Sequence, residues 1–138
     1  MAAQSVKKAL GEIAFRVADL AKMQQFYEEV IGLELMKRFP HTAFFKIAEG
    51  LAGHTQILAL FDRTANSDYT GLDATKSTVD HIAFAIALED FAGEKARLKE
   101  LGVPVRTSEH AWVHWRSLYV NDPEENLVEF VCYDEAVS

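Results

Sequence analysis

An internal repeat at half the chain length constrains the fold more than any other feature of this sequence. The segment from Glu12 to Ala18, EIAFRVA, aligns with the segment from His81 to Ala87, HIAFAIA, with four identities in seven positions. The offset is 81 − 12 = 69 residues, which is half of 138. Chance similarity of two apolar strands is the alternative, but similar helix ends follow both copies. The repeat therefore predicts two copies of one supersecondary unit.

Each copy predicts a strand, a helix and about three further strands. The strand Ile13–Val17 precedes a helix that begins after Asp19 and ends at Gly32. The strand Ile82–Ile86 precedes a helix that begins after Asp90 and ends at Gly102. Further strands are expected at Ala43–Ala48, Gln56–Phe61, Val113–Val120 and Leu127–Cys132, with a turn over Asn121–Asn126. The predicted fold class is α+β, with two βαβββ modules that form one cupped, mixed β-sheet and helices packed outside.

Length and composition indicate one globular domain. Neither module of about 69 residues is expected to bury much surface alone, so we expect a single domain, 1–138, with modules at about 6–62 and 78–133 and a polar linker between them. The net charge of 14 − 21 = −7 argues against nucleic acid or a membrane as partner. The one cysteine, Cys132, lies in a predicted strand, where a buried and inert thiol is expected. The chain shows neither a transmembrane run nor a signal peptide, so a cytoplasmic location is expected.

The alternation of residues in the repeated strands predicts a cavity. Glu12, Ala14 and Arg16 share one face of their strand, as His81, Ala83 and Ala85 do in the second copy. The opposite faces carry large apolar side chains that suit a core. Small residues beside polar ones indicate a cavity, and Glu129 and Ala59 take matching places on the last strands of the two modules.

A two-fold relation between the modules would gather Glu12, His81, Glu129 and Ala59 around one point. Two carboxylates that lie close together in a partly dry cavity need a compensating cation, and a divalent metal ion would satisfy all three polar groups. Each residue also has an ordinary interpretation: Glu12 as a solvated strand end, His81 as a hydrogen-bonded core histidine, and Glu129 as a partner of Arg16. The expected symmetry favours the metal site.

Four segments together resemble the vicinal oxygen chelate superfamily, which includes glyoxalase I, extradiol dioxygenases, fosfomycin-resistance enzymes and bleomycin-binding proteins. These segments are Glu12–Leu20, Phe26–Leu33 with its Phe-Tyr and Ile-Gly-Leu elements, Asp80–Phe84, and Asp122–Phe130. The resemblance covers nearly the whole chain. It implies paired βαβββ modules around a divalent metal ion, with Glu12, His81 and Glu129 at the ligand positions.

The resemblance also implies roles for other residues and several possible reactions. Arg16 would bind a substrate carboxylate or phosphate, or else pair with an acidic neighbour, and Tyr119 would be a catalytic residue that hydrogen-bonds a substrate oxygen or else a core aromatic residue. Trp115 and Ser117 are further substrate-binding candidates. Ala59 stands where glyoxalase I has a fourth ligand, and Glu12 stands where dioxygenases usually have histidine. The expected metal is Mn²⁺, Zn²⁺, Fe²⁺ or Ni²⁺, and the harder donor set favours Mn²⁺, Mg²⁺ or Zn²⁺ over Fe²⁺.

The predicted function is a metal-dependent enzyme that acts on a small oxygenated organic molecule, in the manner of a ring-cleaving dioxygenase or a glyoxalase. The alternatives are a non-catalytic drug- or metabolite-binding protein similar to the bleomycin-resistance proteins, and a thiol transferase similar to the fosfomycin-resistance enzymes. A metal-free member of the family with a regulatory or structural role is a third alternative. His110 and His114, near Trp112 and Trp115, could form a wall of the cavity or else pack in a loop. A homodimer is also expected, since short chains of this family often pair. Large aromatic residues could lie in that interface or in the intrachain core: Phe39, Phe44, Phe45, Trp112 and Trp115.

Overall fold

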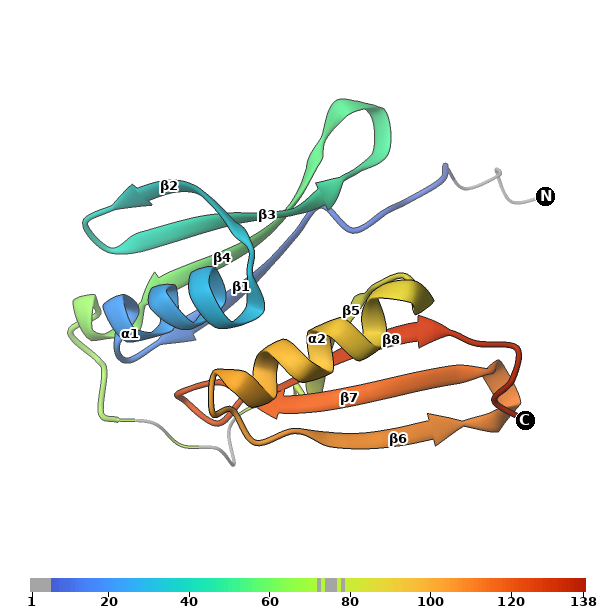
Figure 1. The fold of residues 1–138 in the computed structure, drawn as a ribbon. Coiled ribbons are helices and arrows are strands. Elements are labelled where there is room, and N and C mark those ends of the chain that lie inside the picture. Colours follow the sequence, from blue (N-terminus) through green and yellow to red (C-terminus); the bar gives the residue numbers. More distant parts are fainter. Residues whose placement is uncertain (1–5, 72, 74–76, 78) are drawn as a thin grey trace. The chain divides into compact units, whose positions relative to one another are not determined.

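The computed structural model describes residues 6–71, 73, 77 and 79–138, and its chain forms two compact units that divide after Gly71 (Figure 1). Each unit contains a strand, a helix and three further strands. The first residue of the predicted linker over 62–78 is still the last residue of a strand, and the 3₁₀ turn η3 (Arg63–Ala65) follows it. Positions 72, 74–76 and 78 of this linker lie outside the described residues. The packing of both modules on one shared core stays a prediction.

The N-terminal unit is a four-stranded sheet with one helical segment on it. Its strands lie in the order β1-β4-β3-β2, in which β1 runs parallel to β4 and the other neighbours are antiparallel. The elements are β1 (Glu12–Val17), α1 (Leu20–Gln25), a π-helical segment η1 (Phe26–Ile31), β2 (Glu34–Phe39), β3 (Thr42–Glu49), the 3₁₀ turn η2 (Leu51–Gly53) and β4 (Thr55–Asp62).

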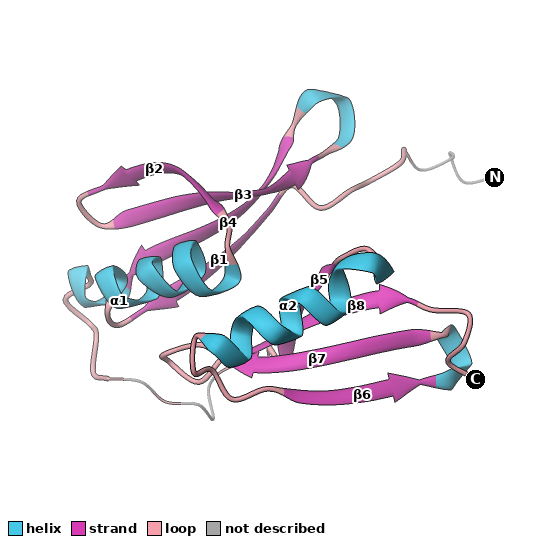
Figure 2. Ribbon diagram, viewed as in Figure 1, coloured by secondary structure: helices cyan, strands magenta, loops and turns pink. Residues whose placement is uncertain are grey.

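The C-terminal unit repeats this topology. The strand order is β5-β8-β7-β6, with β5 parallel to β8 and the other neighbours antiparallel (Figure 2). The elements are β5 (His81–Ala85), α2 (Leu88–Glu100), β6 (Arg106–His110), the 3₁₀ turn η5 (Ala111–Val113), β7 (Trp115–Asn121) and β8 (Leu127–Tyr133). The prediction that β1 and β5 are equivalent strands is confirmed, because each lies at a sheet edge beside the last strand of its unit.

The helix boundaries follow from local capping, with one correction. The Asp19 side chain accepts a hydrogen bond from the backbone N–H of Lys22 at 3.1 Å, and Gly32 ends the helical segment at a φ of 86°, which favours glycine. The second helix was expected to begin after Asp90, but it begins at Leu88. Asp90 lies in the first turn instead, where the positive end of the helix dipole favours an acidic side chain.

One face of each sheet forms a core beneath its helix. In the N-terminal unit α1 packs on β3 and β4, and the buried Tyr27 and Phe45 rings lie 6.4 Å apart between the layers. In the C-terminal unit α2 packs on β8, where Val128, Phe130 and Cys132 are buried. Residues on β1 and β5 alternate between more and less buried positions as the sequence predicts, and Cys132 is buried as expected.

The α+β class and the two βαβββ modules are confirmed, and two details differ from expectation. Each module forms its own four-stranded sheet, whereas one shared sheet was expected. The strand expected from Val113 begins instead at Trp115, because His114 takes a left-handed φ of 57° and its Nδ1 lies 2.6 Å from the carbonyl oxygen of Val137. The expected turn after β7 is present, with Asp122 accepting hydrogen bonds from two backbone N–H groups, those of Glu124 and Asn126. In the described part of the chain no helix has the length and apolarity required to cross a membrane.

Candidate functional site

The polar residues of the C-terminal unit gather on the sheet face opposite α2. Strand register decides this, because residues paired across neighbouring strands present their side chains on the same face. Ala83 pairs with Glu129, Glu129 with Tyr119, and Ser117 with Ser108. His81 and His110 lie two residues from Ala83 and Ser108, so both share that face. We call it the open face of the C-terminal sheet.

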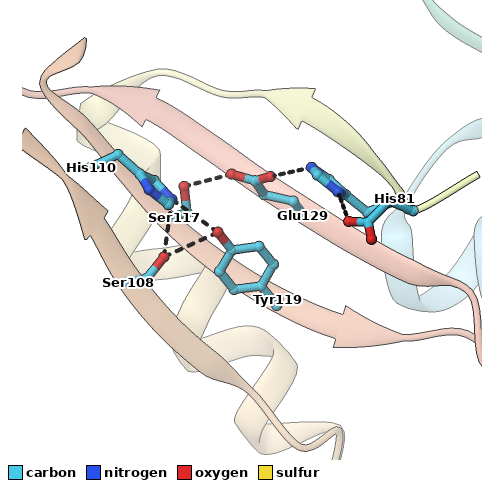
Figure 3. Close-up of polar contacts among 7 residues, drawn as sticks. His81, Ser108, His110, Ser117, Tyr119 and Glu129 are labelled. Atoms are coloured by element: carbon cyan, nitrogen blue, oxygen red, sulfur yellow. Dashed lines mark hydrogen bonds and ion pairs between the residues drawn. The ribbon is translucent and has the colours of Figure 1, made fainter. Parts of the chain in front are cut away.

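Four side chains form one chain of contacts: three belong to the strands β5, β7 and β8, and the fourth, that of Asp80, lies just before β5. Nε2 of His81 lies 3.1 Å from Oε1 of Glu129, and Nδ1 of His81 lies 2.7 Å from Oδ2 of Asp80 (Figure 3). The Ser117 hydroxyl donates to Oε2 of Glu129 at 2.6 Å. Glu129 is only 5% exposed and Ser117 is fully buried, while His81 remains partly open. The two oxygens of Glu129 therefore have different partners, Ser117 on one and His81 on the other.

The His81–Glu129 pair fits two adjacent ligands of one divalent metal ion. Zinc-like ions hold imidazole nitrogen and carboxylate oxygen at about 2.0–2.2 Å, so two neighbouring donors on one ion lie roughly 3–3.5 Å apart. The observed separation of 3.1 Å agrees with this value. Metal-binding histidines commonly donate their other ring N–H to a carboxylate, and Asp80 is placed to accept it. Within either unit by itself, the described residues contain no group of three or more His, Cys, Asp or Glu side chains that could hold a metal ion.

The remaining predicted ligand, Glu12, lies on the N-terminal unit. It begins β1, is exposed, and shares a face with Ala14 and Arg16, as the sequence predicts. Ala59 pairs with Ala14 in the neighbouring strand β4 and is fully buried. The convergence of Glu12 with His81 and Glu129 stays a prediction, and so does the vacant fourth corner at Ala59.

Tyr119 belongs to a second polar cluster on the open face. Its hydroxyl lies 3.0 Å from Oγ of Ser108 and 3.0 Å from Nε2 of His110, and Oγ of Ser108 lies 3.1 Å from Nε2 of His110 (Figure 3). Loop packing, one of the two interpretations of His110, is wrong, because His110 is the last residue of β6. Ser108 was missed by sequence reasoning, although Ser108 and His110 have the two-residue spacing of one strand face.

The two predicted substrate-binding residues on β7 have different surroundings. Trp115 begins the strand and is half-exposed, with its ring 6.5 Å from the ring of Trp112, which is 85% exposed. Ser117 is buried, and its single hydroxyl proton goes to Glu129. Ser117 could therefore only accept a hydrogen bond from a substrate. In the structure its hydroxyl positions the Glu129 carboxylate.

Comparison with known proteins gives the same fold over most of the chain. Residues 9–130 match the family model for the Glyoxalase/Bleomycin resistance protein/Dioxygenase superfamily. A lactoylglutathione lyase structure from Agrobacterium tumefaciens is similar at 28% identity and a TM-score of 0.66, covering 93% of this chain and 96% of that one.

Two further structures share the fold at lower identity. A glyoxalase/dioxygenase from Nostoc punctiforme is 21% identical with a TM-score of 0.69, covering 97% of this chain and 100% of that one. The fosfomycin resistance protein FosX from Listeria monocytogenes is 23% identical with a TM-score of 0.67, covering 95% and 98%.

Proposed function

Because the chain belongs to the Glyoxalase/Bleomycin resistance protein/Dioxygenase superfamily, we propose that it is a metal-dependent enzyme acting on a small organic molecule with two neighbouring oxygen atoms. The observation that carries the proposal is the 3.1 Å separation of Nε2 of His81 and Oε1 of Glu129. The other polar atom of each side chain has its own partner: Nδ1 of His81 contacts Asp80, and Oε2 of Glu129 accepts from Ser117. Such support is typical of ligands pre-positioned for a metal ion.

Glu12 is the proposed third ligand, from the N-terminal module. Three protein ligands would leave coordination positions open for the substrate oxygens, and a bound divalent ion would supply Lewis-acid polarisation and a template for orientation. Arg16, four residues from Glu12 on the same strand face, would bind a substrate carboxylate or phosphate. Tyr119 would donate a hydrogen bond to a substrate oxygen.

The reaction class follows from the same ligand set. Alanine at position 59 can neither coordinate a metal ion nor act as a base. Chemistry similar to that of a ring-cleaving dioxygenase or a transferase needs no fourth protein ligand, so it is compatible with Ala59. Glyoxalase-like isomerisation would need a base from another residue. The competing proposal is a non-catalytic binding protein. The exposed Trp112 and half-exposed Trp115 favour it, since aromatic side chains suit a planar ligand.

Metal binding tests the proposal directly. Protein purified without added metal is dialysed against Mn²⁺ or Zn²⁺, and bound metal is measured by elemental analysis. We expect about one ion per chain, a loss of more than about a hundredfold in affinity for His81→Ala, and a loss of about 10–100-fold for Asp80→Asn. His41→Ala is the matched control, because His41 lies in the β2–β3 turn beside Asp62. Absence of binding under every loading condition would favour the binding protein.

We also propose a homodimer. In the described structure Phe45 belongs to the intrachain core, whereas Phe39 and Trp112 are exposed. Exposed large aromatic residues are typical of interfaces. Light scattering should give about twice the chain mass of 15.5 kDa. A mass of one chain at every concentration would contradict the dimer.

A further inference from the structure

Three phenylalanine rings form a continuous row on the N-terminal sheet. They come from three neighbouring strands: Phe39 ends β2, Phe44 lies in β3 and Phe61 lies in β4 (Figure 1). The rings of Phe39 and Phe44 lie 6.0 Å apart at 89°, and those of Phe44 and Phe61 lie 6.0 Å apart at 79°. Aromatic rings prefer such edge-to-face contacts. We call these three residues the phenylalanine row.

The row lies on the sheet face opposite α1, outside the core. Phe45 is fully buried in the core, so the alternation of β3 turns Phe44 to the other face. Phe44 pairs with Ala59 of β4, and Phe61 lies two residues beyond Ala59 on the same face. Phe39 is 47% exposed and Phe61 is 39% exposed. Contiguous exposed apolar side chains of this kind are typical of a binding surface.

The side chains on this face change from phenyl rings to methyl groups toward β1. Ala59 pairs with Phe44 on one side and with Ala14 on the other, so all three share the face. Ala59 is fully buried, whereas Ala14, on the edge strand β1, is exposed. A flat apolar group that lies over these alanines would therefore have phenylalanine rings beside it.

The charge beside the alanines is positive. Arg16 pairs with Phe61 in the β1–β4 register and lies two residues from Ala14 on the same face. It is exposed, and it has no ion pair or hydrogen bond with another described residue. Lys37, by contrast, has its ammonium group 5.5 Å from the centre of the Phe39 ring. The guanidinium of Arg16 is therefore the cation that a ligand on the alanines would meet.

We propose that the phenylalanine row and Arg16 bind a planar aromatic acid, with its ring system over Ala14 and Ala59. Aromatic contact with Phe44 and Phe61 selects a ring over an aliphatic chain. The guanidinium selects an anion, because it can donate two parallel hydrogen bonds to a carboxylate. The inference narrows the substrate class of the proposed function and rests on that function for the reaction. Binding itself involves only residues of the N-terminal unit and none of the proposed metal ligands.

Calorimetric titration of the full-length protein with 2-naphthoate tests this binding. The titration is made in chelator, so that no metal ion contributes. 2-Naphthoate lacks a pair of neighbouring oxygens outside its carboxylate, so it reports on the ring and the charge alone. 2-Naphthamide has the same ring system without the charge, and it should bind about tenfold more weakly.

Substitutions separate the two contacts. Arg16→Met removes the charge, so 2-naphthoate should bind about tenfold more weakly while the affinity for 2-naphthamide stays within about twofold. Phe61→Leu keeps an apolar side chain at an exposed position, and both probes should bind about three- to tenfold more weakly. Arg38→Met is the matched control, because Arg38 is an exposed arginine whose register partner Ala43 belongs to the core, so it lies on the other face.

Three results would overturn the proposal. The first is equal affinity for the two probes, or an Arg16→Met variant that loses both equally. The second is loss of 2-naphthoate binding in Trp112→Ala, which would place the probe on the C-terminal unit. The third concerns a second copy of the chain as occupant: if 2-naphthoate does not bind and Phe61→Leu halves the mass measured by light scattering, the row is an interface between copies.

Failure of this inference and failure of the proposed function give different results. Binding of 2-naphthoate in a protein that does not bind Mn²⁺ would refute the metal-dependent enzyme and leave the aromatic-acid site standing. Binding of Mn²⁺ without binding of 2-naphthoate would refute the aromatic-acid site and leave the metal proposal standing.

Discussion

Replacement of Ser117 by alanine tests the support of Glu129 in the metal-free protein. The hydroxyl of Ser117 donates to Oε2 of Glu129 at 2.6 Å, and both residues are buried. The substitution removes one oxygen atom and leaves a buried carboxylate oxygen without this donor. A hydrogen bond to a charged group contributes about 1.5–3 kcal/mol, so we expect the free energy of unfolding, measured by a signal from the C-terminal unit, to fall by about that amount.

Urea unfolding followed by tryptophan fluorescence suits this unit. The sequence has two tryptophans, Trp112 and Trp115, and both lie in the C-terminal unit, so the signal reports its unfolding. With an m-value of about 1.5 kcal/mol/M, the expected loss lowers the urea midpoint by roughly 1–2 M. The measurement is made in chelator, so that metal binding does not contribute to stability.

Ser108→Ala is the matched control for this substitution. Ser108 also donates to a side chain of the open face, but its acceptor is the neutral hydroxyl of Tyr119 and it is only half-buried. Its loss should lower the free energy of unfolding by about 0.5–1.5 kcal/mol. If Ser117→Ala costs no more than Ser108→Ala, the buried bond to Glu129 does not stabilise the unit and the reasoning fails.

Two further predictions concern the end of the chain. Burial and, to a smaller extent, the negative charge of Asp134 raise the pKa of the Cys132 thiol. A thiol reagent near neutral pH should therefore modify Cys132 at least about tenfold more slowly in the folded protein than in concentrated urea. Equal rates would mean that the thiol is accessible in the folded protein. The backbone N–H of Ala136 and the guanidinium of Arg116 hold the pKa of Asp134 below its ordinary value, so their stabilisation is present above that value and is lost as pH falls through the folded pKa, below about pH 4. Asp134→Asn should therefore lower the urea midpoint near neutral pH and have a vanishing effect in acid. The control Glu135→Gln, at an exposed position, should show no such pH dependence. An effect of Asp134→Asn that stays constant from neutral pH to acid would contradict the lowered pKa of Asp134.

Local sequence patterns determined the elements and most of their faces. The repeat predicted two βαβββ modules, because similar strands and helix ends impose similar local structure. The alternation of polar and apolar residues placed Glu12 with Arg16 on one face of β1 and placed His81 away from the core. These features depend on residues a few positions apart, and such spacings are fixed by strand and helix geometry.

Only the tertiary structure decided which polar residues meet. The register of β7 against β8 pairs Tyr119 with Glu129 across the turn after Asn121, and a shift of one residue would have turned Tyr119 to the other face. The register of β6 against β7 likewise brings Ser108 and His110 to the open face, although nothing in their local sequence points to a partner on another strand. Strand pairing depends on packing between residues far apart in the chain, whereas the alternation along a single strand does not. The sequence by itself therefore indicates which residues can form a site, and the pairing of strands decides which of them do.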